Sequence, residues 1–191
     1  MPDIIMQTVF SRFFIYAAKQ IPVITLLCLM SFSSWAANDD AKQPIHIEAD
    51  RMQYDNANKV SRFFGNVVAS QGSLTIRAAQ MDVRQVASGH QLGVAIGSAQ
   101  HRAYFRQNRD NTNEYIEGEA IRLEYDSRTT TLKLVGDATI RRYRGTELWD
   151  QSSGGVITYN DTTSFFTVES GPNSSSASGR MTMVLTPEPN D

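Results

Sequence analysis

Three kinds of side chain in this sequence have types and spacings that can do chemistry: histidines, paired carboxylates and clustered arginines. The histidines are His46, His90 and His101, and none stands at ligand spacing from another histidine, a cysteine or an acidic residue on a helix. A metal site needs several such ligands converging on one ion. The sequence therefore predicts no metal site and no cofactor.

One carboxylate pair is Glu117 and Glu119, which would share one face of a β-strand. Two carboxylates can act as general acid and general base, as in glycoside hydrolysis. A solvated strand face explains the same spacing, because like charges repel only weakly in water. The sequence has no phosphate-binding loop and no Gly-x-Ser-x-Gly turn. We therefore predict no catalytic residues and a protein that is not an enzyme.

The densest basic cluster contains Arg141, Arg142 and Arg144. Guanidinium groups match the oxygens of phosphate, so these residues are candidate phosphate contacts. Charges that protect an edge strand from unwanted pairing are the alternative explanation, and both stay open. The chain carries a net charge of −2, which does not favour nucleic acid as a partner. A second cluster comprises Arg102, Arg106 and Arg109.

The first 36 residues are typical of a cleavable signal peptide. Arg12 and Lys19 precede an apolar run at 21–32, and Ser34 and Ala36 are the small residues of a cleavage site. The run is shorter than the roughly 20 residues that a membrane-spanning helix needs. We predict export and cleavage after Ala36, and an uncleaved membrane anchor is the alternative.

The remaining chain has the size of one domain. Cys28, the only cysteine, lies in the predicted signal peptide, so the exported part must be stabilised by its core and its backbone ladder. We predict a flexible N-terminus at 37–43, a single domain at 44–187 and a disordered tail at 188–191.

Apolar residues recur with a period of two after Pro44. In Thr131–Arg141, the residues Leu132, Leu134, Gly136, Ala138 and Ile140 fall on one face, and Ile121, Leu123 and Tyr125 show the same alternation. This period indicates strands with one apolar face, typical of antiparallel sheets. The stretches 87–100, 106–113 and 171–179 are expected to be loops.

One strand–turn–strand pattern occurs twice. Tyr54 and Gly65 are eleven residues apart, as are Tyr125 and Gly136, with polar turn residues between them. A repeated hairpin is typical of proteins that stack similar units. Each glycine is interpreted as a bulge or bend in a curved sheet, and a ligand contact is the alternative.

With no helix expected to cover it, the apolar face of such a sheet has two possible uses. The sheet can close on itself around a dry core, or it can leave an apolar groove. Flexible and aromatic side chains suit a groove for acyl chains. Periodicity does not separate the two.

Two blocks of sequence carry a family resemblance, Gln43-Pro44-Ile45-His46-Ile47-Glu48-Ala49-Asp50 and Phe63-Phe64-Gly65-Asn66-Val67-Val68-Ala69-Ser70-Gln71-Gly72. Shorter blocks follow in order at residues 116–118, 123–125, 134–138 and 181–187. Together they resemble the LptA family of periplasmic lipopolysaccharide-transport proteins, which have an OstA-like domain. The resemblance covers about residues 43–187, and only 87–100 matches poorly.

The resemblance implies an all-β fold, namely an open, twisted β-jellyroll of many consecutive antiparallel strands. It implies a periplasmic carrier that holds the acyl chains of lipopolysaccharide in its interior and assembles head to tail into a bridge between the two membranes. The implied partners are lipopolysaccharide, further copies of the chain, an inner-membrane anchored relative and an outer-membrane translocon. A purely structural β-connector and the membrane-anchored relative itself are the alternative functions.

Alternation and resemblance together predict which residues line the groove and which edges carry assembly. The edges are expected near Ile45–Asp50 and Met181–Leu185, where unpaired strands can be extended by another chain. The predicted lipid-binding residues are Ile45, Ile47, Phe63, Val67, Ile76, Phe105, Ile116, Leu123, Tyr125, Leu134 and Ile140.

Overall fold

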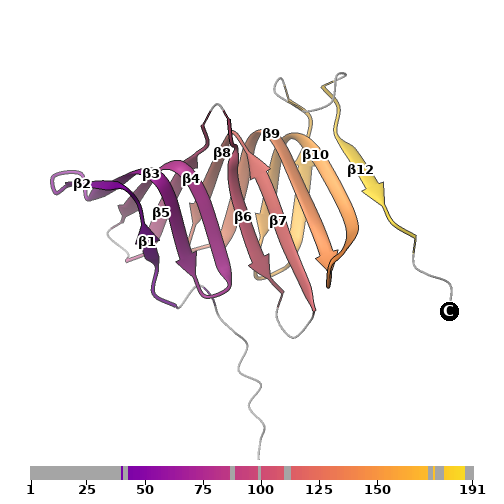
Figure 1. The fold of residues 1–191 in the computed structure, drawn as a ribbon, viewed down its shortest axis with the longest axis horizontal. Helices are drawn as coiled ribbons and strands as arrows, with labels where there is room; N and C mark the ends of the chain where they lie inside the picture. Colours follow the sequence, from indigo (N-terminus) through magenta and orange to yellow (C-terminus); the bar gives the residue numbers. More distant parts are fainter. Residues whose placement is uncertain are drawn as a thin grey trace, which may run out of the picture. The chain divides into compact units, whose positions relative to one another are not determined.

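The computed structural model describes residue 40 and residues 43–86, 89–98, 100–109, 113–171, 174 and 179–187. These residues form an antiparallel all-β fold, as the period of two predicted (Figure 1). They include no helix long and apolar enough to cross a membrane. The predicted signal peptide at 1–36, the tail at 188–191 and all of 37–43 except Asp40 and Gln43 lie outside the described residues.

The described strands fall into two sets of six. The first set is β1 (His46–Glu48), β2 (Arg51–Asp55), β3 (Val60–Gln71), β4 (Leu74–Gln85), β5 (Gln91–Ile96) and β6 (Ala103–Asn108). The second set is β7 (Glu114–Ala120), β8 (Arg122–Asp126), β9 (Thr131–Arg144), β10 (Glu147–Asn160), β11 (Phe165–Glu169) and β12 (Thr182–Leu185). We call β1–β6 the first repeat and β7–β12 the second repeat.

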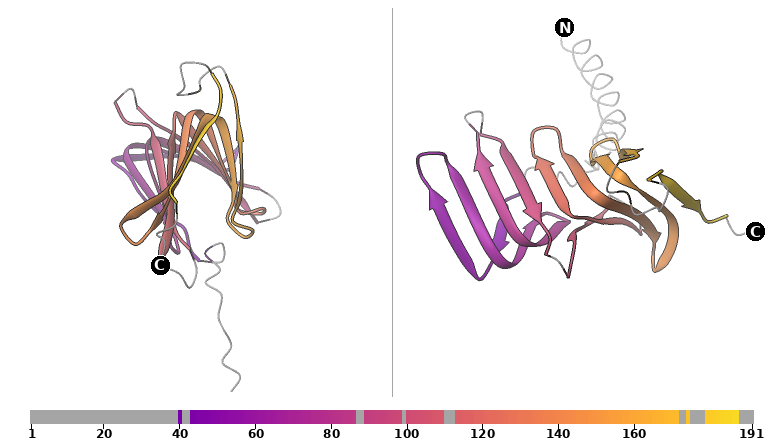
Figure 2. Two further views of the ribbon diagram at one scale, coloured as in Figure 1. Left: turned by 90° about the vertical axis from the view of Figure 1, so that its right-hand side faces the viewer. Right: turned by 90° about the horizontal axis from the view of Figure 1, so that it is seen from above.

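The four long strands β3, β4, β9 and β10 each pass from one layer of the sheet into another. The early part of β3 pairs with β2 and its later part with β1. In the same way β4 pairs with β5 and β6, β9 with β8 and β7, and β10 with β11 and β12. Two layers result, and they diverge from the bends of the long strands (Figure 2, left).

Each layer contains one part of every long strand. The first layer has the order β2-β3-β4-β5-β8-β9-β10-β11. The second layer has the order β1-β3-β4-β6-β7-β9-β10-β12. Because the side chains of a strand alternate between faces, each layer turns one apolar face toward the other layer.

The bends of β3 and β9 are built by two residue pairs with left-handed backbone. Gly65 and Asn66 have φ of 77° and 44°, and Gly136 and Asp137 have φ of 79° and 48°. The strand register shifts at both places. The predicted bulges are therefore confirmed. A side chain at Gly136 would also collide with Ile121, because its Cβ would lie 2.9 Å from the Ile121 Cδ1.

The two repeats have the same strand topology, and their first three strands correspond with an offset of 71 residues. Lys59 and Thr130 both have positive φ before the second strand of their hairpins. The amide of Asp50 donates to the Gly65 carbonyl at 3.1 Å, as the amide of Ile121 donates to the Gly136 carbonyl at 2.9 Å. The repeated hairpin seen in the sequence is thus the visible part of a duplicated six-strand unit.

Two expectations about the strands were wrong. The expected loop at 87–100 contains β5, and the expected loop at 106–113 begins with the last three residues of β6. In β5 the inward positions are Gly93 and Ala95, while the bulky Leu92 and Ile96 point outward. The strand therefore lacks the inward row of large apolar residues from which the others were recognised.

The alternation expected at Ile121 is also broken. Ile121 is about half exposed, whereas Leu123, two residues later, is buried. Ala120 is buried as well, so the inward set changes parity between β7 and β8. The change follows from geometry, because Ile121 sits over the bend at Gly136 where the chain moves from one layer to the other.

Candidate functional site

The structure brings the eleven predicted groove residues onto the facing sides of the two layers. Seven are buried in one continuous hydrophobic core: Val67, Ile76, Phe105, Ile116, Leu123, Leu134 and Ile140. Ile47, Phe63 and Tyr125 are partly buried against that core, and Ile45 lines a cleft beside it.

This cleft, the interior cleft, lies between the two layers, mainly in the first repeat, and reaches β8 and β9 of the second repeat. It contains about 40 Å³ of free space, enough for at most a few water molecules. Its walls are apolar apart from a few polar side chains. The described lining residues are Ile45, Ile47, Ala69, Ser70, Gln71, Leu74, Ile76, Met81, Val83, Gln91, Gly93, Ala95, Leu123, Tyr125 and Leu132.

A polar contact crosses the interior cleft at the rim opposite the bends. Tyr125, from the first layer, donates its hydroxyl to Gln71 Oε1 at 3.3 Å, and Gln71 belongs to the part of β3 in the second layer. Gln71 Nε2 donates in turn to the Gln43 carbonyl at 3.0 Å. Gln71 is only 6% exposed. We call the Tyr125–Gln71 contact the rim clasp.

Gln71 was missed by sequence reasoning, although a signal for it was present. It continues the inward series of Val67 and Ala69 at a spacing of two, but its amide did not fit an apolar pattern. Leu74, Met81 and Leu132 were also absent from the predicted site residues, yet each continues an apolar alternation.

The first described residue also reaches this rim. Asp40 accepts a hydrogen bond from Gln107 Nε2 at 3.2 Å and another from the Ser73 hydroxyl. Gln107 is buried on β6, and Ser73 lies in the β3–β4 turn. These contacts tie Asp40 to the second layer.

The strand geometry separates Arg141 from the other two arginines predicted as phosphate contacts. Arg141 points to the outer face of the second layer, where it contacts Glu119 at 3.1 Å and Gln151 at 2.9 Å. Arg144 stacks on Trp149, 3.8 Å from the ring centroid, and its Nε lies 3.2 Å from Glu114 Oε1.

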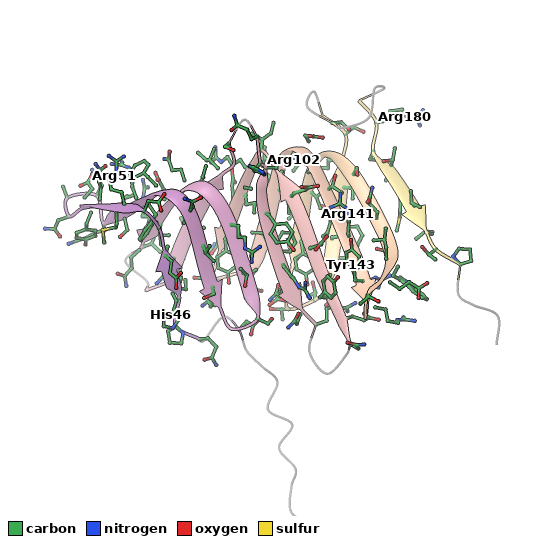
Figure 3. The ribbon with its side chains drawn as sticks, viewed as in Figure 1. His46, Arg51, Arg102, Arg141, Tyr143 and Arg180 are labelled. Carbon is green, nitrogen blue, oxygen red and sulfur yellow. The ribbon has the colours of Figure 1, made fainter. Side chains whose placement is uncertain are left out.

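Arg142 and Arg144 share the inward-facing side of β9 because they are two residues apart, and Arg142 is the more buried of the two. Its register partners Ile116 and Asp150 are both buried, and its guanidinium pairs with the Asp150 carboxylate. Two donors of the guanidinium are used in this pair, so others remain for a further acceptor. Figure 3 labels Arg141 and Tyr143 on β9, on the outer face of the second layer.

The paired carboxylates are held in polar contacts on the outer face of β7. Glu117 accepts a hydrogen bond from the Tyr104 hydroxyl at 2.9 Å. Burial, followed by the hydrogen bond to Glu117, raises the pKa of Tyr104 to about 12. Glu119 Oε1 lies 3.1 Å from both Arg102 and Arg141. Within the described ranges, no group of three or more His, Cys, Asp or Glu residues is arranged to hold a metal ion.

Apolar inner-face residues are exposed at both ends of the described fold. At one end Met52 and Tyr54 of β2 are each 56% exposed, although Met52 stands opposite the inner-face residue Phe63 and Tyr54 follows it on the same face. At the other end Met183 and Leu185 of β12 are 48% and 67% exposed. In Figure 3, Arg51 and His46 mark the first end and Arg180 marks the second.

The fold and its apolar interior define a class of protein: a two-layer antiparallel jellyroll whose inner faces run to both ends. A family model described as LptA/(LptD N-terminal domain) LPS transport protein matches residues 46–165. The chain belongs to this family, which confirms the resemblance found in the sequence.

Individual relatives agree with this assignment. The chain is 29% identical over 143 residues to the lipopolysaccharide export system protein LptA of Haemophilus influenzae, covering 75% of this chain and 80% of the relative. It is 32% identical over 116 residues to the LptA of Escherichia coli K12, covering 61% of this chain and 62% of that protein.

A solved structure shows the same fold. The LptA-homologous periplasmic component LptH of Pseudomonas aeruginosa matches with a TM-score of 0.67 at 22% identity. The match covers 78% of this chain and 99% of that one.

Proposed function

We propose that this protein is a periplasmic carrier of lipopolysaccharide, that it holds the acyl chains between its two layers, and that it is not an enzyme. The observation that carries the proposal is the continuous apolar interior, which reaches exposed inner-face residues at both ends. Family membership supports the cargo, since the matching relatives are lipopolysaccharide export proteins. The periplasmic location rests on the same relatives and on the predicted signal peptide.

We expect the two layers to move apart when the carrier is loaded. The side chains of one continuous core meet between the layers, so an acyl chain would have to move some of them apart. Each buried methylene is worth about 0.8 kcal/mol, so a long acyl chain supplies enough free energy to offset a rim opening that breaks a few neutral hydrogen bonds of about 1 kcal/mol each. The rim clasp is one such bond, and its 3.3 Å length makes it a weak one.

Of the three arginines, Arg142 and Arg144 remain proposed phosphate contacts, because both lie on the inward-facing side of β9. Arg141 faces away from the interior and contacts Glu119 of β7, whereas Arg144 lies on the same side of β9 as Arg142 and contacts Glu114. A lipid whose acyl chains lie between the layers presents its head group at the rim, where the inner face of β9 carries Arg142 and Arg144. Arginine suits phosphate because its donors form a planar fork.

We further propose that copies join head to tail through β1 and β2 at one end and β11 and β12 at the other. The outermost strands of each layer have one unpaired backbone edge among the described residues. A second chain can extend such an edge by strand addition. Because the two ends differ, the contact is heterologous, and a heterologous contact that does not close into a ring continues as a filament. The proposed inner-membrane and outer-membrane partners would occupy the two ends of that filament.

Photo-cross-linking to lipopolysaccharide tests the proposed interior. A photoreactive residue at Phe63 or Leu134 should capture the lipid, whereas one at Phe64 or Val135, on the opposite faces of the same strands, should not. Equal capture at facing and outward positions would contradict the proposal. Delipidated protein that polymerises but shows no saturable binding of lipopolysaccharide would instead support a purely structural connector.

A further inference from the structure

The two repeats are joined inside the chain by one ladder in each layer. In the first layer β5 pairs with β8, so that Gly93 stands opposite Tyr125 and Ile96 opposite Arg122. In the second layer β6 pairs with β7, so that Phe105 stands opposite Gly118. The repeats correspond strand by strand. Therefore β11 and β12 are the last strands of a copy, just as β5 and β6 are the last strands of its first repeat.

The internal junction specifies a register for a junction between copies. Ile96 and Glu169 are the last residues of β5 and β11, and both pair with the residue that follows the bend of the long strand. Arg122 and Arg51 are the first residues of β8 and β2. Since Ile96 pairs with Arg122, the same ladder between copies pairs Glu169 with Arg51 of the next copy.

The side chains in this register are complementary. Glu169 and Arg51 have opposite charges. The inner-face pairs are apolar, and a slip by one residue would turn each inner residue of one strand to the outer face. The inner-face pairs are Phe166 with Tyr54, Val168 with Met52, Met183 with Ile47 and Leu185 with Ile45 of the next copy.

The rim clasp has a counterpart in the second repeat that a single copy does not complete. With the 71-residue offset, Tyr54 is equivalent to Tyr125, and Arg142 is equivalent to Gln71. Tyr54 and Arg142 therefore occupy the positions of the rim clasp in the other repeat. Within one copy they lie on β2 and β9, separated in the first layer by β3, β4, β5 and β8. In the junction register, Tyr54 of the next copy takes the place over Arg142 that Tyr125 takes over Gln71.

We infer that Tyr54 of one copy accepts a hydrogen bond from Arg142 of the preceding copy and so closes the rim of that copy's second repeat. Both side chains are available: Tyr54 is 56% exposed, and the Arg142 side chain is 36% exposed. The inference rests on the proposed carrier function and adds a coupling to it. An assembled copy has both rims clasped and should retain an acyl chain longer than an isolated one.

Cysteine pairs test the contact directly. Cys28 is the only cysteine, so in a Cys28→Ser background each introduced pair is unique. With a short bismaleimide, Tyr54→Cys together with Arg142→Cys should give a ladder of covalent oligomers. Gln71→Cys with Tyr125→Cys should cross-link within one chain. Gln53→Cys with Arg142→Cys, which moves the first thiol to the outer face, should give several-fold less oligomer. Absence of a ladder, or equal ladders with Gln53→Cys, would overturn the register.

Probe release tests the coupling. A fluorescent fatty acid should leave assembled wild-type protein several-fold more slowly than it leaves dilute single copies, and Tyr54→Phe should abolish this difference while light scattering still shows assembly. Equal slowing in wild type and Tyr54→Phe would overturn the coupling. If wild-type protein binds no probe at all, the carrier function fails, whereas the cross-linking result still decides the junction.

Discussion

Phe105 and Tyr159 stack on each other across the interior, with ring centroids 6.2 Å apart and planes inclined by 23°. Phe105 belongs to β6 of the second layer, and Tyr159 to the part of β10 in the first layer. Both rings are almost fully buried. The pair therefore holds the two layers together in the middle of the fold, at a distance from both exposed ends.

Removing the Phe105 ring should destabilise the fold strongly. Phe105→Ala should lower the free energy of unfolding by about 3–5 kcal/mol, the usual cost of deleting a buried phenylalanine. Phe165→Ala is the matched control, because Phe165 is 65% exposed on the outer face of β11, and its cost should be well below 1 kcal/mol. Urea denaturation of the two variants measures the difference. Similar midpoints would mean that the interior is not packed as described.

Replacing the bend glycine should also be costly. Gly136→Ala forces a left-handed residue to carry a side chain, at about 1–2 kcal/mol, and pushes the new Cβ toward Ile121. Gly93→Ala is the control, since its Cβ would meet Tyr125 Cβ at an ordinary 3.7 Å. Thermal unfolding should show a clear loss for the first variant and little change for the second. An equally stable Gly136→Ala would show that the bend does not require glycine.

The buried tyrosines should make stability fall in strong alkali. Burial, together with the nearby Asp161 charge, raises the pKa of Tyr159 to about 12 from 10.0. A raised pKa stabilises the folded state below the unfolded value, so this contribution is complete below pH 10 and is lost as the pH rises toward 12. Denaturation midpoints measured from pH 9 to 12 should decline, and Tyr159→Phe should decline less steeply. Parallel declines would assign the effect to other groups.

Removing the last strand should separate folding from assembly. β12 pairs with β10 in the described fold, and its apolar side chains are exposed rather than part of the core. Deleting residues 179–191 should therefore leave a folded, mainly monomeric protein. Circular dichroism reports the fold, and light scattering reports the mass. Oligomers of undiminished size would show that the β12 edge does not carry the contact between copies.

Strands with an inward row of large residues were predictable from the sequence, whereas β5 was not. The inward face of β9 can be predicted because bulky residues alternate with polar ones, as Leu132, Leu134 and Ile140 show. In β5 the inward Gly93 and Ala95 leave room for Tyr125 and Leu123 on the neighbouring strand. A pattern based on large apolar side chains fails when one strand carries small residues that make room for the large side chains of its neighbour.

The candidate site divides in the same way. The apolar lining followed from alternation, but the partners of the arginines did not. Arg141 and Arg142 are adjacent in sequence and therefore point to opposite faces, so the density of the cluster was misleading. Gln71 and Tyr125 meet across the two layers although they lie 54 residues apart, and such a contact depends on the tertiary fold rather than on any local pattern.

The passage of β3, β4, β9 and β10 through both layers has a mechanical consequence. Ladder hydrogen bonds keep neighbouring strands about 4.8 Å apart, so one strand cannot swing outward without drawing its neighbours along. The row of bends therefore acts as a common hinge, and the angle between the two layers changes for all strands together. Separating the two layers at one end of the fold therefore also separates them to some degree along the rest of the hinge.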